Sequence, residues 1–361
     1  MPPRLSPKWR TGIAHEVPLS RGGVRHTNAD LFMTEAAAGE SLDPQVLRAW
    51  DLEGAEARAL TGGTANANFL VADGATRYFL RRRSPRYSSE IQLAFDHALM
   101  KRLAECGVRG PNPIPTRDGQ THVRIGEHAF ELHPYLDGKS VDWENLDHLR
   151  TAAAALRTFH EATASFKPPV QKEWPRDDAP DRIRRGLAEL REEIHHAEGI
   201  ATLDELERWT DRIERALPDS AYWALPCQII HGDFHPGNVH VSGNSLGIFD
   251  LDCASRQPRA RDLADAILYF CARRDGPFDA STIVRLTRQC WLDPERNAIF
   301  LAAYGPLEET ERAALRWLVA ARWIYSRVHG RRKLPRSQWP EYAVTGVLTP
   351  LAQLQDETGL I

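Results

Sequence analysis

The densest group of polar side chains in the chain lies between two short apolar runs near residue 235. Its members, in chain order, are His231, Asp233, His235 and Asn238, followed by Asp250 and Asp252. Glycine and proline between them favour turns. We therefore expect these carboxylates on loops between strands, where polar groups can converge on one point.

The spacing of these groups suits phosphoryl transfer. In protein kinases an aspartate orients the attacking hydroxyl, an asparagine five positions later binds Mg²⁺, and a further aspartate binds metal near the phosphates. Asp233 and Asn238 are five positions apart, and Asp250 follows twelve residues later.

The elements that must position these groups differ between the two halves of the chain. Asp43 and Ser41 offer N-cap oxygens for a short helix through Trp50. Apolar runs then predict strands, and an apolar period of three and four predicts a helix. The strands are expected at 57–63, 67–73, 76–83, 111–116, 121–126 and 128–136, and the helix at 89–106. Residues 45–135 are thus expected to form an antiparallel sheet with one helix after its third strand.

From Trp143 onward the pattern changes to helices, interrupted by two short strands within 226–252. Helices are expected at about 143–164, 181–196, 202–216, 260–273, 279–291, 308–329 and 339–356. A proline-rich stretch, residues 167–175, is expected to be an exposed loop. Residues 1–32 show no period and are expected to be a disordered extension, or an artefact of an upstream start codon.

Composition excludes several classes of protein. The 361 residues are 42% hydrophobic and 26% charged, which excludes a mostly disordered or collagen-like chain and suffices for about two lobes. Lys and Arg number 46 against 49 Asp and Glu, so neither nucleic acid nor a membrane surface is an expected partner. No apolar window is long enough to span a bilayer. Five dispersed cysteines indicate reduced thiols and a cytoplasmic protein. Nothing in the pattern indicates an oligomeric state.

Two motifs together carry a family resemblance. HGDFHPGNV, followed by FDLDCASRQPRARDLA, resembles the aminoglycoside phosphotransferase and type II homoserine kinase family over roughly residues 50–330. The resemblance implies an α+β, protein-kinase-like fold with two lobes. A small antiparallel-sheet N-lobe would occupy residues 41–135, and a larger, mostly helical C-lobe residues 136–361. It also implies transfer of the γ-phosphoryl group of ATP, with Mg²⁺, to a hydroxyl of a small molecule.

By this resemblance Asp233 is the catalytic base or the carboxylate that orients the substrate hydroxyl. Asn238 and Asp250 are expected to bind Mg²⁺ through oxygen atoms. Asp252 is expected to touch a second metal ion or to brace the loop. His231 is expected to order the catalytic loop by hydrogen bonding, and His235 to act similarly nearer the active face. Asp262 is expected to cap a helix and to hydrogen-bond this loop.

The N-terminal half carries the nucleotide-binding residues that the resemblance implies. Gly62, Gly63 and Asn68 lie where the family has its phosphate-covering loop. Arg81 occupies the place of the cation that pairs with the phosphates, and Arg82 or Arg83 takes it if the register slips by one residue.

Asp96 stands where the helix carries an acidic partner for that cation, with Glu90 as a rival. The segment Glu131–Tyr135, which includes His133, resembles the hinge whose backbone groups would hold the adenine edge.

The acceptor is the least determined feature. The glycine loop and the helix after it favour a homoserine-like acceptor over an amino-sugar or aminoglycoside. Residues that could reach the acceptor from the helical half are Arg256, Trp323, Tyr325 and His329. Two other functions are open. One is a hydrolase with two metal ions held by His231, Asp233, His235, His240, Asp250 and Asp252. The other is a nucleotide-binding scaffold without catalytic activity.

Overall fold

The computed structural model describes residues 34–35, 42–61, 66–243, 245–276 and 278–356. The expected extension at 1–32, and Gly62 and Gly63 of the predicted phosphate loop, lie outside this part of the chain.

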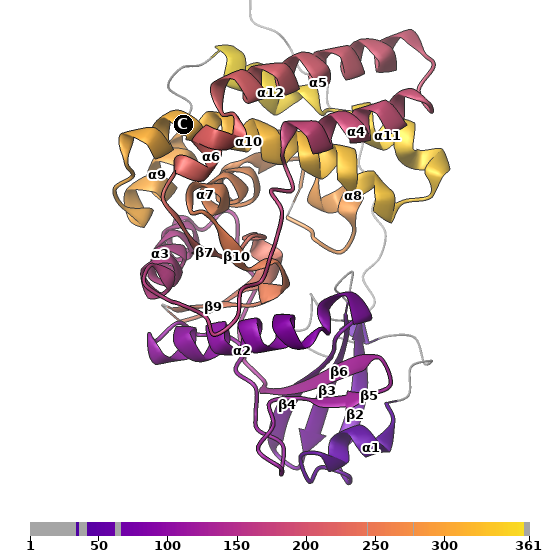
Figure 1. The fold of residues 1–361 in the computed structure, drawn as a ribbon, viewed down its shortest axis with the longest axis vertical. Coiled ribbons are helices and arrows are strands. Elements are labelled where there is room, and N and C mark those ends of the chain that lie inside the picture. The colour runs from indigo at the N-terminus through magenta and orange to yellow at the C-terminus, as the bar shows by residue number, and fades with distance from the viewer. Residues whose placement is uncertain (1–33, 36–41, 62–65, 244, 277, 357–361) are drawn as a thin grey trace, which may run out of the picture.

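An antiparallel sheet forms the N-terminal region, in the order β1-β2-β3-β4-β6-β5 (Figure 1). Its strands are β1 (Thr34–Glu35), β2 (Glu56–Thr61), β3 (Ala67–Asp73), β4 (Thr76–Arg82), β5 (Val123–Ile125) and β6 (His128–Pro134). The β3–β4 turn uses Gly74 at a φ of 56°, a conformation that costs glycine little. Residues 111–116, expected as a strand, have no regular structure.

Two helices accompany this sheet. Helix α1 (Pro44–Arg48) is capped by Asp43, and helix α2 (Glu90–Glu105) by Ser89. The predicted antiparallel sheet is therefore confirmed, and α2 follows β4, the third of the predicted strands. It is the fourth strand of the sheet because Thr34–Glu35 adds an edge strand that the sequence did not predict.

The C-terminal region is mostly helical (Figure 1). Its helices are α3 (Leu146–Thr163), α4 (Pro180–Arg191), α5 (Ala197–Ala216), α6 (Asp219–Ala224), α7 (Ala260–Ala266), α8 (Ile283–Leu286), α9 (Pro294–Tyr304), α10 (Glu309–Gly330), α11 (Trp339–Val344) and α12 (Leu348–Asp356). Short antiparallel pairs join β7 (Cys227–Ile230) to β10 (Ser255–Pro258), β8 (Val239–Ser242) to β9 (Ser245–Ile248), and β11 (Arg273–Arg274) to β12 (Cys290–Trp291).

Two of the predicted helices are wrong in extent. The span 279–291 holds only the one-turn α8, because Cys290 and Trp291 pair with β11 instead. The span 339–356 is broken into two helices at Gly346, which has a φ of 66°. Helix α9 was not predicted, although Asp293 followed by proline is an N-cap signal.

Two hydrophobic clusters correspond to the two lobes. One lies under the sheet and includes Phe69, Val71 and Leu80. The other fills the helical region and takes in Phe95 and Leu99 of α2. Helix α2 therefore packs on the helical lobe, although the chain enters and leaves it from the sheet, and Figure 1 shows it between the two.

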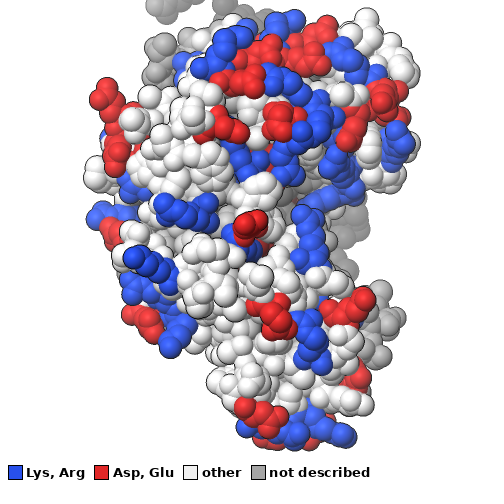
Figure 2. Space-filling model, viewed as in Figure 1, with Lys and Arg blue, Asp and Glu red and all other residues white. Residues whose placement is uncertain are grey.

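Two further features concern membrane spans and the charge of the surface. None of the described helices combines the length and apolarity needed to cross a membrane. Basic and acidic side chains intermingle on the face of the molecule drawn in Figure 2.

Candidate active site

The loop that carries Asp233 is held by one buried carboxylate, that of Asp262. Its Oδ2 accepts the His231 N–H at 2.8 Å, and its Oδ1 accepts the Gly232 N–H at 2.8 Å. His160 Nε2 lies 3.0 Å from the same carboxylate. Burial opposes ionisation, but the bond from His160 holds the pKa of Asp262 below its usual value. The predicted bracing role is present. The predicted capping role is wrong, since Arg259 is the N-cap of α7.

Gly232 and His231 fix the path of the same loop. Gly232 has a φ of 82°, and a Cβ there would lie 2.4 Å from the carbonyl oxygen of Cys253, so only glycine fits. The Nδ1 atom of His231 accepts the N–H of Asp233 at 3.2 Å, and its Nε2 atom donates to the carbonyl of Phe249 at 2.8 Å. These contacts give His231 the ordering role that the sequence predicts.

Asp233 points into an open position beside Asn238 and His235. Its side chain is 42% exposed, and the Nε2 atom of His235 lies 3.6 Å from its Oδ2. Burial would raise the pKa of Asp233, but the His235 ring lowers it below its ordinary value. Conversely, burial opposes a charge on His235, yet the Asp233 carboxylate raises the pKa of that ring. Asp233 is therefore an ionised hydrogen-bond acceptor at neutral pH.

Asn238 and Asp250 lie next to Asp233. The amide nitrogen of Asn238 donates to the Asp233 carbonyl at 2.9 Å, which keeps the amide oxygen available for another partner. The N–H of Phe249 donates to the Asn238 carbonyl at 2.9 Å, so the turn that presents Asp250 is tied to the loop. Asp250 adopts a left-handed conformation with a φ of 59°, and its side chain is 43% exposed. Burial and the Asp233 charge favour a higher pKa for Asp250, but the attraction of Arg81 outweighs both, so the pKa of Asp250 lies below its ordinary value.

The donor chemistry at this point fits a hard divalent cation. An amide oxygen and a partly exposed carboxylate are ligands that Mg²⁺ prefers, and it commonly keeps several waters. Asn238 and Asp250 would hold it. The roles of Asp233, Asn238 and Asp250 as catalytic residue and ligands stay predictions.

Asp252 is more deeply enclosed than Asp250. Its Oδ2 accepts from Asn66 Nδ2 at 2.7 Å and from Arg81 Nη2 at 3.1 Å. Burial and the Asp250 charge raise its pKa, against the attraction of Arg81. The contacts of Oδ2 brace the loop, and the role of Asp252 as a metal ligand stays a prediction. The sequence predicts Asn68 as the nucleotide-binding asparagine of this segment and does not predict the bond from Asn66 to Asp252.

Arg81 of the cation strand β4 and Arg83, which directly follows the strand, reach carboxylates of the same cluster. Arg81 bonds Asp250 Oδ1 at 2.9 Å, so it joins the sheet directly to the predicted metal site. Arg83 Nη1 lies 2.6 Å from Asp96 Oδ2, and its Nε lies 2.9 Å from Glu131 Oε1. Of the three arginines left open for the cation, Arg83 is therefore the one that pairs with Asp96, and Arg81 pairs with Asp250 instead. Alternate residues of a strand share a face, and Arg83 takes the partner on α2.

Glu90, the rival to Asp96, is not part of this cluster. Its carboxylate is 72% exposed and bonds Arg124 at 2.7 Å on the surface. Asn68 is buried in β3, directly opposite Arg81 of β4.

The predicted hinge differs from the expectation at its end. The Tyr135 N–H donates to the Arg77 carbonyl at 3.2 Å, so it is engaged within the sheet and is not open to an adenine edge. His133 is buried with its Nε2 3.7 Å from the Glu131 carboxylate, and burial lowers its pKa. Glu131 acts through its side chain as an ion-pair partner, a role the sequence reasoning did not foresee.

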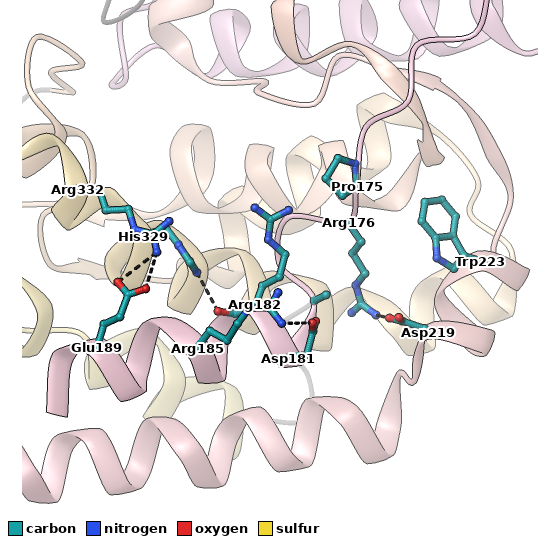
Figure 3. A pocket seen from close by; sticks show the side chains of 11 residues that line it. Pro175, Arg176, Asp181, Arg182, Arg185, Glu189, Asp219, Trp223, His329 and Arg332 are labelled. Atoms are coloured by element: carbon teal, nitrogen blue, oxygen red, sulfur yellow. Dashed lines mark hydrogen bonds and ion pairs between the residues drawn. The ribbon is translucent and has the colours of Figure 1, made fainter. Parts of the chain in front are cut away.

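Of the side chains suggested for the acceptor, Trp323 is core. It is fully buried, and its Nε1 donates to the Val347 carbonyl at 2.7 Å. His329 lines a groove of about 540 Å³ together with arginines of α4, and Figure 3 shows these side chains. No residue of the catalytic loop lines that groove. Arg256 bonds the Cys227 carbonyl at 2.9 Å.

The hydrolase alternative receives no support from the geometry. Among the described residues, no three His, Cys, Asp or Glu side chains are grouped so that they could hold a metal ion. His240 packs against the ring of Phe249, with the ring centres 4.8 Å apart.

Known proteins match this chain over most of its length. The model of the phosphotransferase enzyme family matches residues 56–318. The chain belongs to this family. A homoserine kinase of Phenylobacterium zucineum is 28% identical over 295 residues, which cover 77% of this chain and 81% of the relative. A homoserine kinase of Nitrobacter hamburgensis is 26% identical over 316 residues, covering 82% and 85%.

Solved structures agree on the fold. A microcompartment-associated aminopropanol kinase superposes with a TM-score of 0.64 at 20% identity, covering 88% of this chain and 98% of that one. A choline kinase from Cryptosporidium parvum gives 0.60 at 12% identity, covering 88% and 96%. The predicted protein-kinase-like fold with a sheet N-lobe and a helical C-lobe is confirmed, and so is the class of small-molecule kinase.

Proposed function

We propose that this enzyme transfers the γ-phosphoryl group of ATP, with Mg²⁺, to a hydroxyl of a small metabolite, and that the acceptor resembles homoserine. The observation that carries the proposal is the convergence of Asp233, Asn238 and Asp250, with Arg81 of the sheet reaching Asp250 at 2.9 Å. The inactive-scaffold alternative would not require an ionised, partly exposed carboxylate at this point.

When bound, Mg²⁺ and ATP supply the phosphoryl group and the charge that neutralises its oxygens. Asp233 accepts a hydrogen bond from the acceptor hydroxyl and holds its oxygen in line with the phosphorus. Its lowered pKa makes it a weak base, which favours orientation over early proton removal, as a loose transition state requires. Arg81 lends positive charge beside Asp250.

The acceptor class rests on the relatives. The two relatives described above are both homoserine kinases, whereas the structural neighbours at 20% identity or less bear on the fold alone. We place the enzyme in the cytoplasm, where its five cysteines stay free, as the structure has them.

The test is a panel of alcohols offered to the purified protein with Mg²⁺ and ATP. Homoserine, an amino alcohol and an aminoglycoside are compared by ADP release, and the product is identified as a phosphate monoester by ³¹P NMR. We expect homoserine or a close analogue to give the highest kcat/KM. ADP release without a phosphorylated alcohol, or phosphodiester hydrolysis without ATP, would overturn the proposal.

A second test concerns the metal. Ligands that bind only the native state raise the thermal midpoint by mass action. Mg²⁺ with ATP should raise it in the wild type, and Asp250→Asn should remove the Mg²⁺-dependent part. An unchanged Mg²⁺-dependent rise in Asp250→Asn would contradict the assignment of Asp250.

A further inference from the structure

The segment between α3 and α4, residues 164–179, contains one buried lysine, which lies beside the ion pair of Arg83 and Asp96. The sequence predicts an exposed loop at 167–175, and Lys167 and Gln171 are indeed exposed. Lys172 is the exception, with a side chain only 2% exposed. The expectation is wrong at this residue because the segment runs past α2 on its way to α4, as Figure 1 shows.

Lys172 connects two parts of the molecule that are far apart in the sequence. Its Nζ lies 2.9 Å from Asp96 Oδ1 on α2 and 2.6 Å from the carbonyl oxygen of Asp252. The carbonyl of Leu251 lies 3.5 Å away. The ammonium is thus held by one carboxylate and by the backbone of the turn that follows Asp250.

Burying an ammonium group is costly unless charge and hydrogen bonds compensate it. Asp96 already has Arg83 at 2.6 Å, so a second cation is not needed to neutralise it. What Lys172 adds is the bond to the Asp252 carbonyl. Through it, the turn that sets the position of Asp250 is fixed to α2, and through Asp96 and Arg83 to the sheet.

We propose that Lys172 is a positioning residue of the phosphoryl-transfer centre, which holds the Asp250–Asp252 turn at a fixed place relative to α2 and β4. The inference rests on the proposed function and adds a residue from the segment between α3 and α4. Without the ammonium, Asp96 keeps one cation and the Asp252 carbonyl loses its donor. The Asp250 carboxylate then loses one of the contacts that fix its position for Mg²⁺ and the nucleotide, and keeps its ion pair with Arg81.

The test compares Lys172→Met, which keeps the apolar stem near the rings of Phe95 and Trp174, with the conservative Lys172→Arg. Lys167→Met, at an exposed position of the same segment, is the matched control. The measurement is the affinity for a non-hydrolysable ATP analogue by calorimetry, over a series of Mg²⁺ concentrations. Residues that orient ligands of a metal typically change affinity about 10–100-fold when replaced, and we expect such a loss in Lys172→Met. We expect Lys172→Arg within about 5-fold of the wild type, and Lys167→Met unchanged.

A double variant distinguishes positioning from general destabilisation. If Lys172 acts through Asp96, the losses in Asp96→Asn and Lys172→Met should not add when combined. Lys172→Met could fold with a lower thermal midpoint and still bind the analogue with wild-type affinity. That result would show that Lys172 only stabilises the fold, and it would overturn the proposal. If Lys172→Met does not fold, Lys172→Gln replaces it, and a loss below about 3-fold would overturn the proposal equally. Failure of the wild type to bind the analogue would instead refute the proposed function.

Discussion

The two sides of the candidate active site are held by different kinds of contact. On the helical side, one carboxylate, Asp262, binds two successive backbone N–H groups of the loop that carries Asp233. On the sheet side, Arg81 of β4 and Arg83, directly after β4, bond carboxylates that come from the Asp250–Asp252 turn, from α2 and from β6.

This difference predicts how each side responds to change. Backbone hydrogen bonds to a buried carboxylate define one path for the loop. A single substitution there should therefore cause a large loss of stability that comes from the loop itself. Ion pairs among long side chains share partners, so their effects should be distributed and non-additive. The predictions below test this contrast.

The largest effect is expected at the centre of the helical side. Asp233→Ala should lower kcat at least about 10²-fold while changing the Kd for ATP less than about 10-fold, because the carboxylate faces the acceptor hydroxyl rather than the nucleotide. Single-turnover rates and equilibrium binding measure the two quantities. Asn238→Ala should differ by weakening Mg²⁺ binding as well. Near-wild-type turnover in Asp233→Ala would leave the mechanism without its central residue.

The next effect concerns the support of the same loop. Asp262→Ala leaves the N–H groups of His231 and Gly232 buried without their acceptor, at about 1–3 kcal/mol each. We expect the free energy of unfolding to fall by about 3 kcal/mol, measured by urea denaturation. Asp147→Ala, which removes an 87% exposed carboxylate from the first turn of α3, is the control and should cost less than about 1 kcal/mol. Equal losses of unfolding free energy in Asp262→Ala and Asp147→Ala would contradict the expected large effect at this loop.

The same contrast explains what could be predicted from the sequence. Asp233 and Asn238 lie within one short motif, so the sequence predicts them as neighbours, and the structure brings them together. Their supports, Asp262 and Phe249, lie outside that motif. The partner of Asp96 stayed open among Arg81, Arg82 and Arg83. Strand alternation places Arg81 and Arg83 on one face, and only the packing of α2 decides which of them Asp96 meets.

Burial in connecting segments was equally beyond the sequence. Lys172 lies in a proline-rich stretch that favours an exposed loop, and its burial depends on where that stretch passes α2. The strand at Cys290 likewise follows from a partner distant in sequence, Arg274 of β11. Local signals sufficed for the hairpin of β3 and β4, because these strands and the Asp73–Gly74 turn between them are encoded within a few residues. They failed at 111–116, which has no regular structure.

A smaller effect tests the register of the cation strand. Arg81→Met should weaken binding of the ATP analogue about 10-fold, because it removes the guanidinium that bonds Asp250 and Asp252. Arg82→Met, one residue along the strand on its other face, should change the affinity less than about 2-fold. Calorimetry with both variants measures this. A larger loss of affinity in Arg82→Met than in Arg81→Met would show that Arg82, and not Arg81, is the arginine that serves the nucleotide.

The smallest effect lies at the contact between His235 and Asp233, 3.6 Å apart. The pKa of His235 is raised in the folded protein, so its contribution to stability is complete below its unfolded pKa of about 6.5 and is lost as pH rises through the folded pKa. The pKa of Asp233 is lowered, so its contribution is present above about 3.9 and is lost in acid. The pair therefore stabilises the fold most between these limits.

His235→Gln removes this pH-dependent part. The Nδ1 atom of His235 accepts the Gly237 N–H only while the ring is neutral, so losing this bond costs stability above the folded pKa and reduces the narrowing expected there. The difference in thermal midpoint between wild type and variant should be greatest near pH 5–6 and narrow by about 1–2 °C towards pH 9, a small change because Asp233 is partly exposed. Thermal unfolding in buffers of constant ionic strength across this range measures the narrowing. A difference that stays constant with pH would mean that the ring carries no charge beside Asp233, and that the low pKa of this carboxylate has another origin.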